Sequence, residues 1–283
     1  MSFTKNDISR YYDLSEVHYN LMWNLRKSKS LHYGYWDDSV SNFHESLLNL
    51  NKVLARHADI KPTDYVLDAG CGVGGSSVWL AKNIGCKVTG ISLNKEQVRK
   101  ANLLAAHQQL NDHVSFSVND YTDTGFPGQS FNIVWGIESV CYANDKSDFL
   151  KEAARLLKSG GKVIIADFFK QDKLKGEDAE IVKGMAHGWA INDFSIPHEF
   201  EQKLKENGFN ILVNEDASQA IMPSAKRLYK AYLLGFIPAK LYGLLNRKAT
   251  SLGKRNVDTA KYQYIGLKKN LWQYKIYCAQ KIN

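Results

Sequence analysis

A single acidic residue stands where an apolar run ends, in a position from which it could take a proton. Glu138 follows residues 131–136, whose apolar character predicts a buried strand. In an open sheet of parallel strands, ligands bind beyond the carboxyl ends of the strands. A carboxylate placed there can act as a general base, and the hydroxyl of Tyr142 is a second candidate for that role. A salt bridge that serves only the fold is the alternative for Glu138.

A cluster of glycines predicts the place where a ligand lies against the main chain. Residues 65–69 form a short apolar run that includes Asp68, and Gly70, Gly72 and Gly74 follow it before an amphipathic stretch. This order predicts a buried strand, a tight turn and the start of a helix, whose free N–H groups point toward a bound molecule. Glycine permits the positive φ angles that such a turn needs.

The glycine spacing also matches a dinucleotide site, but the acid is in the wrong place for one. Gly70, Gly72 and Gly75 satisfy the pattern G-x-G-x-x-G. A dinucleotide site expects an acid about 20 residues further on, at the tip of the second strand, where it binds the ribose. Residues 88–91 predict that strand, and no acid stands at its tip. The acid of this sequence, Asp68, precedes the turn instead.

The segment from Asp68 to Gly74 resembles motif I of class I S-adenosylmethionine-dependent methyltransferases. The resemblance implies S-adenosylmethionine as the methyl donor, S-adenosylhomocysteine as the product, and no metal. It also implies an α/β fold with a doubly wound, seven-stranded Rossmann-like sheet in the order 3-2-1-4-5-7-6. The last strand of that sheet is antiparallel, and helical insertions cap it. A structural turn without a ligand is the alternative.

Two further segments resemble a branch of this family that methylates small molecules. His32, Gly34 and Trp36 match the H-x-G-x-W segment of tocopherol methyltransferases. The pair Glu138-Ser139 resembles the Glu-Ser or Glu-Ala pair of tocopherol, sterol and prenyl-diphosphate methyltransferases. The resemblance favours C-methylation of a small, largely apolar acceptor, such as an isoprenoid, sterol or tocopherol-like molecule. O- or N-methylation of a small polar metabolite is the alternative.

Several residues beyond the glycine turn are candidates for contact with the donor. The resemblance to cyclopropane synthases and sterol methyltransferases places Ser92, Asn94 and Gln97 at the ribose, although Asn94 and Gln97 also fit a helix cap and its return bond. The residues after the third predicted strand are expected near the adenine amine, unless they form only an Asx turn. An aromatic ring before the core could pack over a sulfonium. These last candidates are Asn119, Asp120, Tyr121 and Tyr33.

Aromatic residues from distant parts of the chain are the candidates for an acceptor pocket. They are Tyr35, Trp36, Trp135, Trp189 and Tyr229. Aromatic faces stabilise the carbocation that an alkene acceptor would form, and Glu138 or a tyrosine would take the lost proton. With a phenol or quinol acceptor, Glu138 would hold or deprotonate the hydroxyl. His187 is a further catalytic candidate, with packing as its alternative.

Composition indicates one large α/β domain with insertions. The chain has 283 residues, of which 44% are hydrophobic and 23% charged. Residues 1–60 are expected to form N-terminal helices and an aromatic lid segment, and residues 61–283 the donor-binding core. Helical insertions are expected at about 171–195 and about 222–268.

The cysteine pattern fits a reducing compartment. The four cysteines form no C-x-x-C pair, so neither a zinc site nor a disulfide framework is expected. The sequence has no recognisable secretory segment and no apolar run long enough to span a bilayer. We therefore expect a cytoplasmic protein.

Positive charge is concentrated near the C-terminus. The net charge is +8, but residues 223–283 contain 13 Lys/Arg and one acid, a local charge of +12. Residues 222–248 predict a basic amphipathic helix pair, interrupted near Gly235 and Pro238, that could cap the pocket or lie peripherally on an anionic membrane. A solvated basic face, a diphosphate site and a nucleic-acid partner are the alternatives. Nucleic acid is disfavoured, because no Asn-Pro-Pro-Tyr-type tetrapeptide follows residues 131–136.

Overall fold

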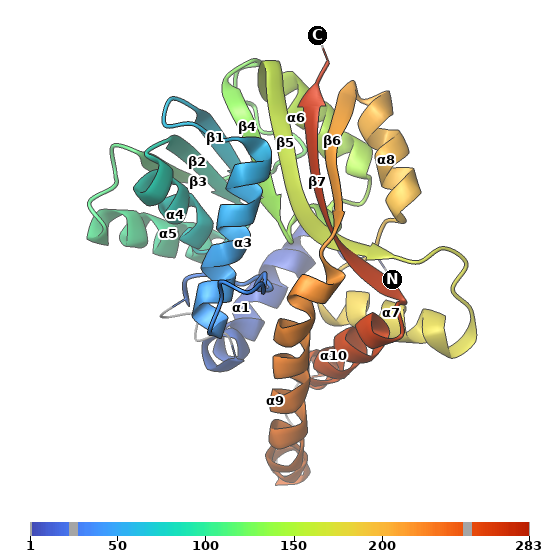
Figure 1. The fold of residues 1–283 in the computed structure, drawn as a ribbon. Helices are drawn as coiled ribbons and strands as arrows, with labels where there is room; N and C mark the ends of the chain where they lie inside the picture. Colours follow the sequence, from blue (N-terminus) through green and yellow to red (C-terminus); the bar gives the residue numbers. More distant parts are fainter. Residues whose placement is uncertain (1, 23–27, 246–250, 283) are drawn as a thin grey trace.

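Seven strands form one sheet, in the order β3-β2-β1-β4-β5-β7-β6 (Figure 1). Neighbouring strands from β3 to β5 run parallel, whereas β7 runs antiparallel between β5 and β6. Both features confirm the predicted fold. The strands are β1 (Tyr65–Ala69), β2 (Lys87–Ser92), β3 (Val114–Val118), β4 (Phe131–Ile137), β5 (Leu157–Lys170), β6 (Phe209–Asp216) and β7 (Trp272–Lys281).

This computed structural model describes residues 2–22, 28–245 and 251–282. For residues 16–22, 235–245 and 251–257 it describes the backbone and not the side chains.

Two layers of helices cover the two faces of the sheet. Along β1, Val66 belongs to one hydrophobic cluster and Leu67 to the other, because successive side chains of a strand point to opposite faces. The first cluster includes residues of α3, α4 and α5, and the second includes residues of α6 and α8. These helices are α3 (Phe43–Ala58), α4 (Gly75–Ile84), α5 (Lys95–His107), α6 (Lys146–Leu156) and α8 (Pro197–Glu206).

Four more helices gather beyond the end of the sheet at which the parallel strands finish (Figure 1). α10 packs against both α7 and α9. In open α/β sheets this is the end at which ligands bind, so these helices are placed to cover a site. They are α1 (Lys5–Met22), α7 (Gly176–Gly188), α9 (Ser218–Leu245) and α10 (Ser251–Lys268).

The predicted helix pair near the C-terminus is wrong in one respect. α9 continues as a single helix through Gly235 and Pro238, and the second helix of the region is α10. Proline removes one main-chain donor and usually kinks or ends a helix. The packing of α9 against α10 is a tertiary contact, and local sequence signals do not reveal it. No described helix combines the length and apolar composition needed to cross a membrane.

Candidate active site

The glycine turn after β1 forms one wall of a cavity, which we call the turn cavity. Gly70, Gly72 and Gly74 have φ angles of 101°, 53° and 85°, a region that glycine adopts without strain. The N–H groups of Gly70 and Cys71 donate to the carbonyl of Ile91 at 3.0 and 2.9 Å, which ties the turn to β2. A side chain at Gly72 would meet no atom within 4 Å, so the main chain there is open to the cavity.

Asp68 holds the end of β1 to the start of α4. Its buried carboxylate accepts a hydrogen bond from the Ser77 hydroxyl at 2.5 Å. Burial raises the pKa of Asp68 to about 7, because the charged form loses its hydration. Asp68 also lines the turn cavity, so the same acid fixes the turn and borders the ligand space.

The next wall of the turn cavity comes from the tip of β2 and the first turn of α5. The side-chain oxygen of Asn94 caps α5 by accepting from the N–H of Gln97 at 2.9 Å. The expected return bond goes elsewhere, because Gln97 Oε1 accepts from the Ser92 hydroxyl at 2.8 Å. The amide of Asn94 donates to Asp13 and to the Ser9 carbonyl of α1, at 2.7 and 3.0 Å. Asn94 therefore links α1 to the sheet.

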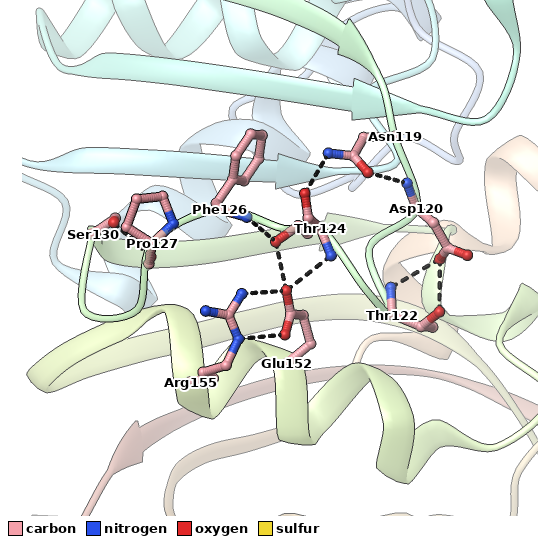
Figure 2. A network of polar contacts seen from close by, with 9 residues as sticks. All are labelled: Asn119, Asp120, Thr122, Thr124, Phe126, Pro127, Ser130, Glu152 and Arg155. Carbon is pink, nitrogen blue, oxygen red and sulfur yellow. Dashed lines mark hydrogen bonds and ion pairs between the residues drawn. The ribbon is translucent and has the colours of Figure 1, made fainter.

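A loop of residues 119–126 follows β3, and a buried carboxylate fixes it (Figure 2). Glu152 of α6 accepts from the N–H and the hydroxyl of Thr124 at 2.9 and 2.5 Å. Arg155 forms a two-pronged contact with the same carboxylate at 2.8 and 2.7 Å, and its hydrogen bonds hold the pKa of Glu152 at about 2. The Thr124 carbonyl accepts from the Asn119 amide at 2.8 Å, so this network positions a residue that lines the turn cavity.

Asp120 and Tyr121 of this loop have different surroundings. Asp120 accepts from the N–H and the hydroxyl of Thr122 at 2.9 and 2.7 Å, which forms an Asx turn, and it pairs with Lys5 of α1. It does not line the turn cavity. Tyr121 does line it, and its hydroxyl donates to the carbonyl of Ser139 at 2.9 Å.

A second cavity adjoins the first, and we call it the aromatic cavity. The two cavities share Tyr12, Leu31, Glu138 and Tyr142. Aromatic rings pack together along the second cavity; the ring centroids of Phe168 and Trp189, for example, are 5.0 Å apart. The lining residues of the aromatic cavity are Tyr12, Leu31, Tyr33, Glu138, Cys141, Tyr142, Phe168, Trp189 and Ile191.

Glu138 lies where the two cavities meet. It follows β4 with a φ angle of 48°, a left-handed conformation that is uncommon for a glutamate. Its Oε1 accepts from the Tyr33 N–H at 2.7 Å and from the Tyr274 hydroxyl at 2.9 Å. No described residue donates to Oε2. Burial raises the pKa of Glu138 well above its ordinary value, which makes its carboxylate a stronger base.

Two buried residues of opposite charge fix the loop of residues 138–143. Asp167 of β5 accepts from the N–H of Cys141 at 2.8 Å, and Lys146 of α6 donates to the Cys141 carbonyl at 2.9 Å. Lys146 also donates to the carbonyl of Ala143. Burial raises the pKa of Asp167 to about 6 and lowers the pKa of Lys146. The loop that carries Glu138 is thus held by its main chain.

α1 covers part of both cavities. Its residue Tyr12 lines both, and the Tyr12 hydroxyl donates to the Tyr142 hydroxyl at 3.1 Å. Ahead of the helix, the N–H and the carbonyl of Phe3 pair with the side-chain amide of Asn192 at 2.6 and 3.1 Å. These contacts attach the start of α1 to the segment that follows α7. In the described part of the chain, no group of three or more His, Cys, Asp or Glu side chains is placed to hold a metal.

Comparisons with known proteins assign this arrangement to a family. A family profile described as "Methyltransferase domain" matches residues 67–165, from β1 to β5. The 27-O-demethylrifamycin SV methyltransferase of Amycolatopsis mediterranei is 31% identical over 221 residues, which are 78% of this chain and 80% of that protein. The chain belongs to the S-adenosylmethionine-dependent methyltransferases.

Two further proteins are similar to this methyltransferase. The sterol 24-C-methyltransferase of Gibberella zeae is 32% identical over 218 residues, 73% of this chain and 56% of that protein. The crystal structure of geranyl diphosphate C-methyltransferase from Streptomyces coelicolor, in complex with Mg²⁺, geranyl-S-thiolodiphosphate and S-adenosyl-L-homocysteine, has a TM-score of 0.79. The match covers 98% of each chain at 22% identity, and it shows the shared fold.

S-adenosylmethionine is the methyl donor of this methyltransferase, and the turn cavity fits it. The uncovered main chain at Gly72 allows a ligand to approach closely, and polar side chains surround the rest of the space. Most of the predicted donor contacts line this cavity: Asp68, Gly70, Gly72, Ser92, Asn94, Gln97, Asn119 and Tyr121.

Three predicted donor contacts lie elsewhere. A side chain at Gly74 would meet Phe116 at 2.8 Å, so this glycine permits close packing inside the methyltransferase core. Asp120 is engaged by its Asx turn and by Lys5. Tyr33 lines the aromatic cavity instead of the turn cavity.

Two of the three aromatic residues at positions 33–36 are structural. The Tyr35 hydroxyl donates to Glu215 of β6 at 2.9 Å, and the Trp36 indole N–H donates to Ser224 of α9 at 2.9 Å. Neither residue lines either cavity, so the structure does not support their predicted contact with an acceptor. Their partners are far away in the sequence, and the aromatic pattern alone gave no sign of them.

Of the remaining predicted pocket residues, one lines a cavity and two pack elsewhere in the protein. Trp189 lines the aromatic cavity. Trp135 of β4 is fully buried in the core, because its strand is covered on both faces. Tyr229 stacks on a tyrosine of α10 with centroids 4.7 Å apart, away from both cavities. His187, predicted as catalytic, lies edge-on to Phe3 at 5.7 Å between centroids and lines neither cavity.

Of the catalytic candidates, Glu138 and Tyr142 line both cavities. The sequence analysis missed Tyr12, Phe168 and Tyr274 as site residues. Phe168 carried a usable signal, because it lies near the end of the mostly apolar run of residues 163–169. Tyr274 carried none, since its contact with Glu138 depends on how the antiparallel β7 pairs with β5.

Proposed function

We propose that this methyltransferase transfers a methyl group to a small, largely apolar acceptor, such as an isoprenoid, sterol or tocopherol-like molecule. The observation that carries the proposal is the position of Glu138, which lines both the turn cavity and the aromatic cavity. A donor in the first cavity and an acceptor in the second would meet beside this carboxyl group. The aromatic and aliphatic lining of the second cavity favours an apolar molecule, and its volume of about 30 Å³ requires the rings to move apart when an acceptor enters.

On the donor side, we assign Ser92 and Gln97 to the ribose and Asn119 and Tyr121 to the adenine. All four line the turn cavity, and hydrogen bonds hold each of them in place. The donor supplies a methyl group on a positively charged sulfur. The chain itself must align the acceptor atom at roughly 3–3.5 Å from that methyl group and keep water away.

With an alkene acceptor, the π electrons form the new carbon–carbon bond as the methyl–sulfur bond breaks. The positive charge left on the acceptor would lie near the rings of Tyr33, Phe168 and Trp189, whose electron-rich faces attract a cation. Glu138 would then take a proton from the neighbouring carbon through Oε2, which restores a double bond. The other oxygen of the carboxylate, Oε1, keeps its hydrogen bonds from the Tyr33 N–H and the Tyr274 hydroxyl.

A hydroxyl acceptor is the second candidate, and one relative favours it. The similar protein from Amycolatopsis mediterranei is named for an O-demethylated substrate. In this reaction the acceptor oxygen attacks the methyl group, and Glu138 takes the hydroxyl proton. Both reactions use the same base, so the product distinguishes them.

The test is to incubate the purified protein with methyl-labelled S-adenosylmethionine and a lipid extract of its source cells, followed by mass spectrometry. A labelled isoprenoid, sterol or quinol supports the proposal, and the position of the label on carbon or oxygen identifies the reaction. Label that appears only in polar metabolites contradicts an apolar acceptor. The Glu138→Gln variant is the control for non-enzymatic transfer.

A further inference from the structure

We propose that one face of α9 docks onto an anionic membrane surface. This face consists of Lys226, Lys230, Leu233 and Leu234, and we call it the outer face of α9. The inference goes beyond the proposed function, because its partner is a lipid bilayer and not the methyl acceptor. It rests on helix geometry, exposure and charge, and its test requires no methyl transfer.

Helical geometry places the outer face away from the body of the protein. Ile221, Ala225 and Leu228 are buried, and their spacing of four and three residues puts them on one side of α9. A helix has 3.6 residues per turn, so each residue advances by about 100°. The four residues of the outer face therefore project from the opposite side.

Two adjacent leucines dominate the outer face. Leu233 and Leu234 are 51% and 81% exposed. In the sequence, Ile237, Leu241 and Leu244 continue the same helical spacing, although their side chains are outside the described part of the structure. Two adjacent leucines that are both exposed on one helix indicate an interaction surface.

The charges beside these two leucines favour an anionic lipid surface. Lys226 and Lys230 are exposed, and no described acid pairs with either of them. Residues 226–257 contain eight Lys/Arg and no acid. At a membrane, the leucines would enter the boundary of the acyl chains while the ammonium groups bind anionic headgroups. A nucleic acid would leave the leucines in water, and a second copy of this chain would bring like charges together.

The position of α9 suits this role. Figure 1 shows α9 reaching past the other elements, at the end of the sheet that holds both cavities. Gln263 of α10 connects α9 to the aromatic cavity. Its side-chain oxygen accepts a hydrogen bond from the Tyr33 hydroxyl, and its side-chain nitrogen donates to the Ala225 carbonyl of α9 at 3.0 Å. A membrane-dissolved acceptor would thus reach the protein at the end where it is used.

The test is sedimentation of the full chain with vesicles of phosphatidylcholine, alone or mixed with phosphatidylserine. We expect binding to the mixed vesicles that falls as salt is raised. The double variant Lys226→Gln/Lys230→Gln should bind roughly 30-fold more weakly, since each lysine near an anionic surface contributes about 1 kcal/mol. Leu233→Ser/Leu234→Ser should weaken binding at least about 10-fold through lost apolar insertion.

The matched control is Lys52→Gln/Lys205→Gln, which removes the same charge from exposed positions on α3 and α8. An equal loss of binding in this control would overturn the proposal, because net charge alone would then explain it. Equal binding of the wild type to both vesicle types would also overturn it. Two further results would overturn it. One is a dimer that forms without lipid and that the leucine variant dissociates. The other is a nucleic-acid complex that is lost in the lysine variant while the binding of that variant to vesicles is unchanged.

Folding of each variant is checked by its melting temperature. If a variant does not fold, the wild type alone tests whether charge drives the binding. Release from mixed vesicles as salt is raised supports this, and binding that salt does not change contradicts it. Vesicle binding without any methylated lipid would refute the proposed acceptor and leave this inference standing, so the two failures are distinguishable.

Discussion

The loops after β3 and β4 carry the two halves of the site, and they are held in place by opposite electrostatic means. Glu152 holds the loop of residues 119–126, and its ion pair with Arg155 keeps the pKa of Glu152 at about 2. Asp167 and Lys146 fix the 138–143 loop from the interior, where burial raises the pKa of Asp167 to about 6. The acid that holds the loop after β3 therefore stays charged at neutral pH, whereas the acid that holds the loop after β4 can exchange a proton near neutral pH.

This difference matches what each half must do. A loop that only positions a donor gains from a carboxylate that stays charged and fully bonded. A loop that carries a base gains from a carboxyl group of raised pKa, and burial raises the pKa of Glu138. The following predictions separate the two loops, starting with the largest expected effect.

Replacing Glu138 by glutamine should reduce kcat by about 10²–10⁴-fold, the usual contribution of a general base. The amide oxygen can still accept from Tyr33 and Tyr274, so the affinity for S-adenosylmethionine should stay close to that of the wild type. Steady-state kinetics and calorimetry measure the two effects. Glu201→Gln is the matched control, because Glu201 also accepts from a tyrosine hydroxyl, that of Tyr277, but away from the cavities. A catalytically normal Glu138→Gln protein would remove the base from the mechanism.

Replacing Glu152 by glutamine should act on the donor side instead. The variant loses the charge that binds Arg155 and part of the hold on Thr124, so S-adenosylmethionine should bind roughly 10-fold more weakly, in line with hydrogen bonds to charged groups. Calorimetric titration measures this affinity. Glu96→Gln is the control, since Glu96 forms the same kind of contact with Arg99 on the surface of α5. An unchanged affinity together with a lowered kcat would contradict the division between the loops.

Replacing Asp167 by asparagine should shift the pH profile of kcat/KM. Activity should rise with pH as Glu138 loses its proton, and the charge of Asp167 adds to burial in raising the pKa of Glu138. Without that charge the pKa of Glu138 falls, so the rising limb should move to lower pH. Asp172→Asn, at an exposed loop position, should leave the limb in place. A lower plateau with an unmoved limb would mean that Asp167 only supports the fold.

The smallest expected effect is on acid stability. Because folding lowers the pKa of Glu152 from 4.5 to about 2, its stabilising contribution is present above pH 4.5 and is lost as pH falls toward 2. The melting temperature of the wild type should therefore fall more steeply over this range than that of Glu152→Gln. Parallel curves for the two proteins would show that the ion pair does not stabilise the folded state.

The sheet and the glycine turn could be predicted from the sequence because local patterns determine them. Apolar runs marked β1, β2 and β4, and Asp68 with its glycines marked the donor turn. Glu138 was also found locally, since an acid at the end of a central strand has few structural uses. The division of roles between the two loops was not visible, because it depends on residues of α6 and β5.

The site predictions that the structure does not support concern side chains whose partners are distant in the sequence. Tyr33, Tyr35 and Trp36 look alike as a pattern, and contacts with β6 and α9 decide which of them reaches a cavity. His187 looked catalytic by residue type, but the folded N-terminus places Phe3 against it. Such contacts arise only when the chain is complete.

The placement of β7 between β5 and β6 has a consequence for synthesis on the ribosome. Residues 272–281 supply the strand with which β6 pairs, and they also bring the Tyr274 hydroxyl to Glu138. A nascent chain that lacks them has an unpaired sheet edge and an incompletely bonded acid. The hydrogen bonds of Glu138 are therefore complete only after residues 272–281 have been made, and earlier intermediates carry an open strand edge.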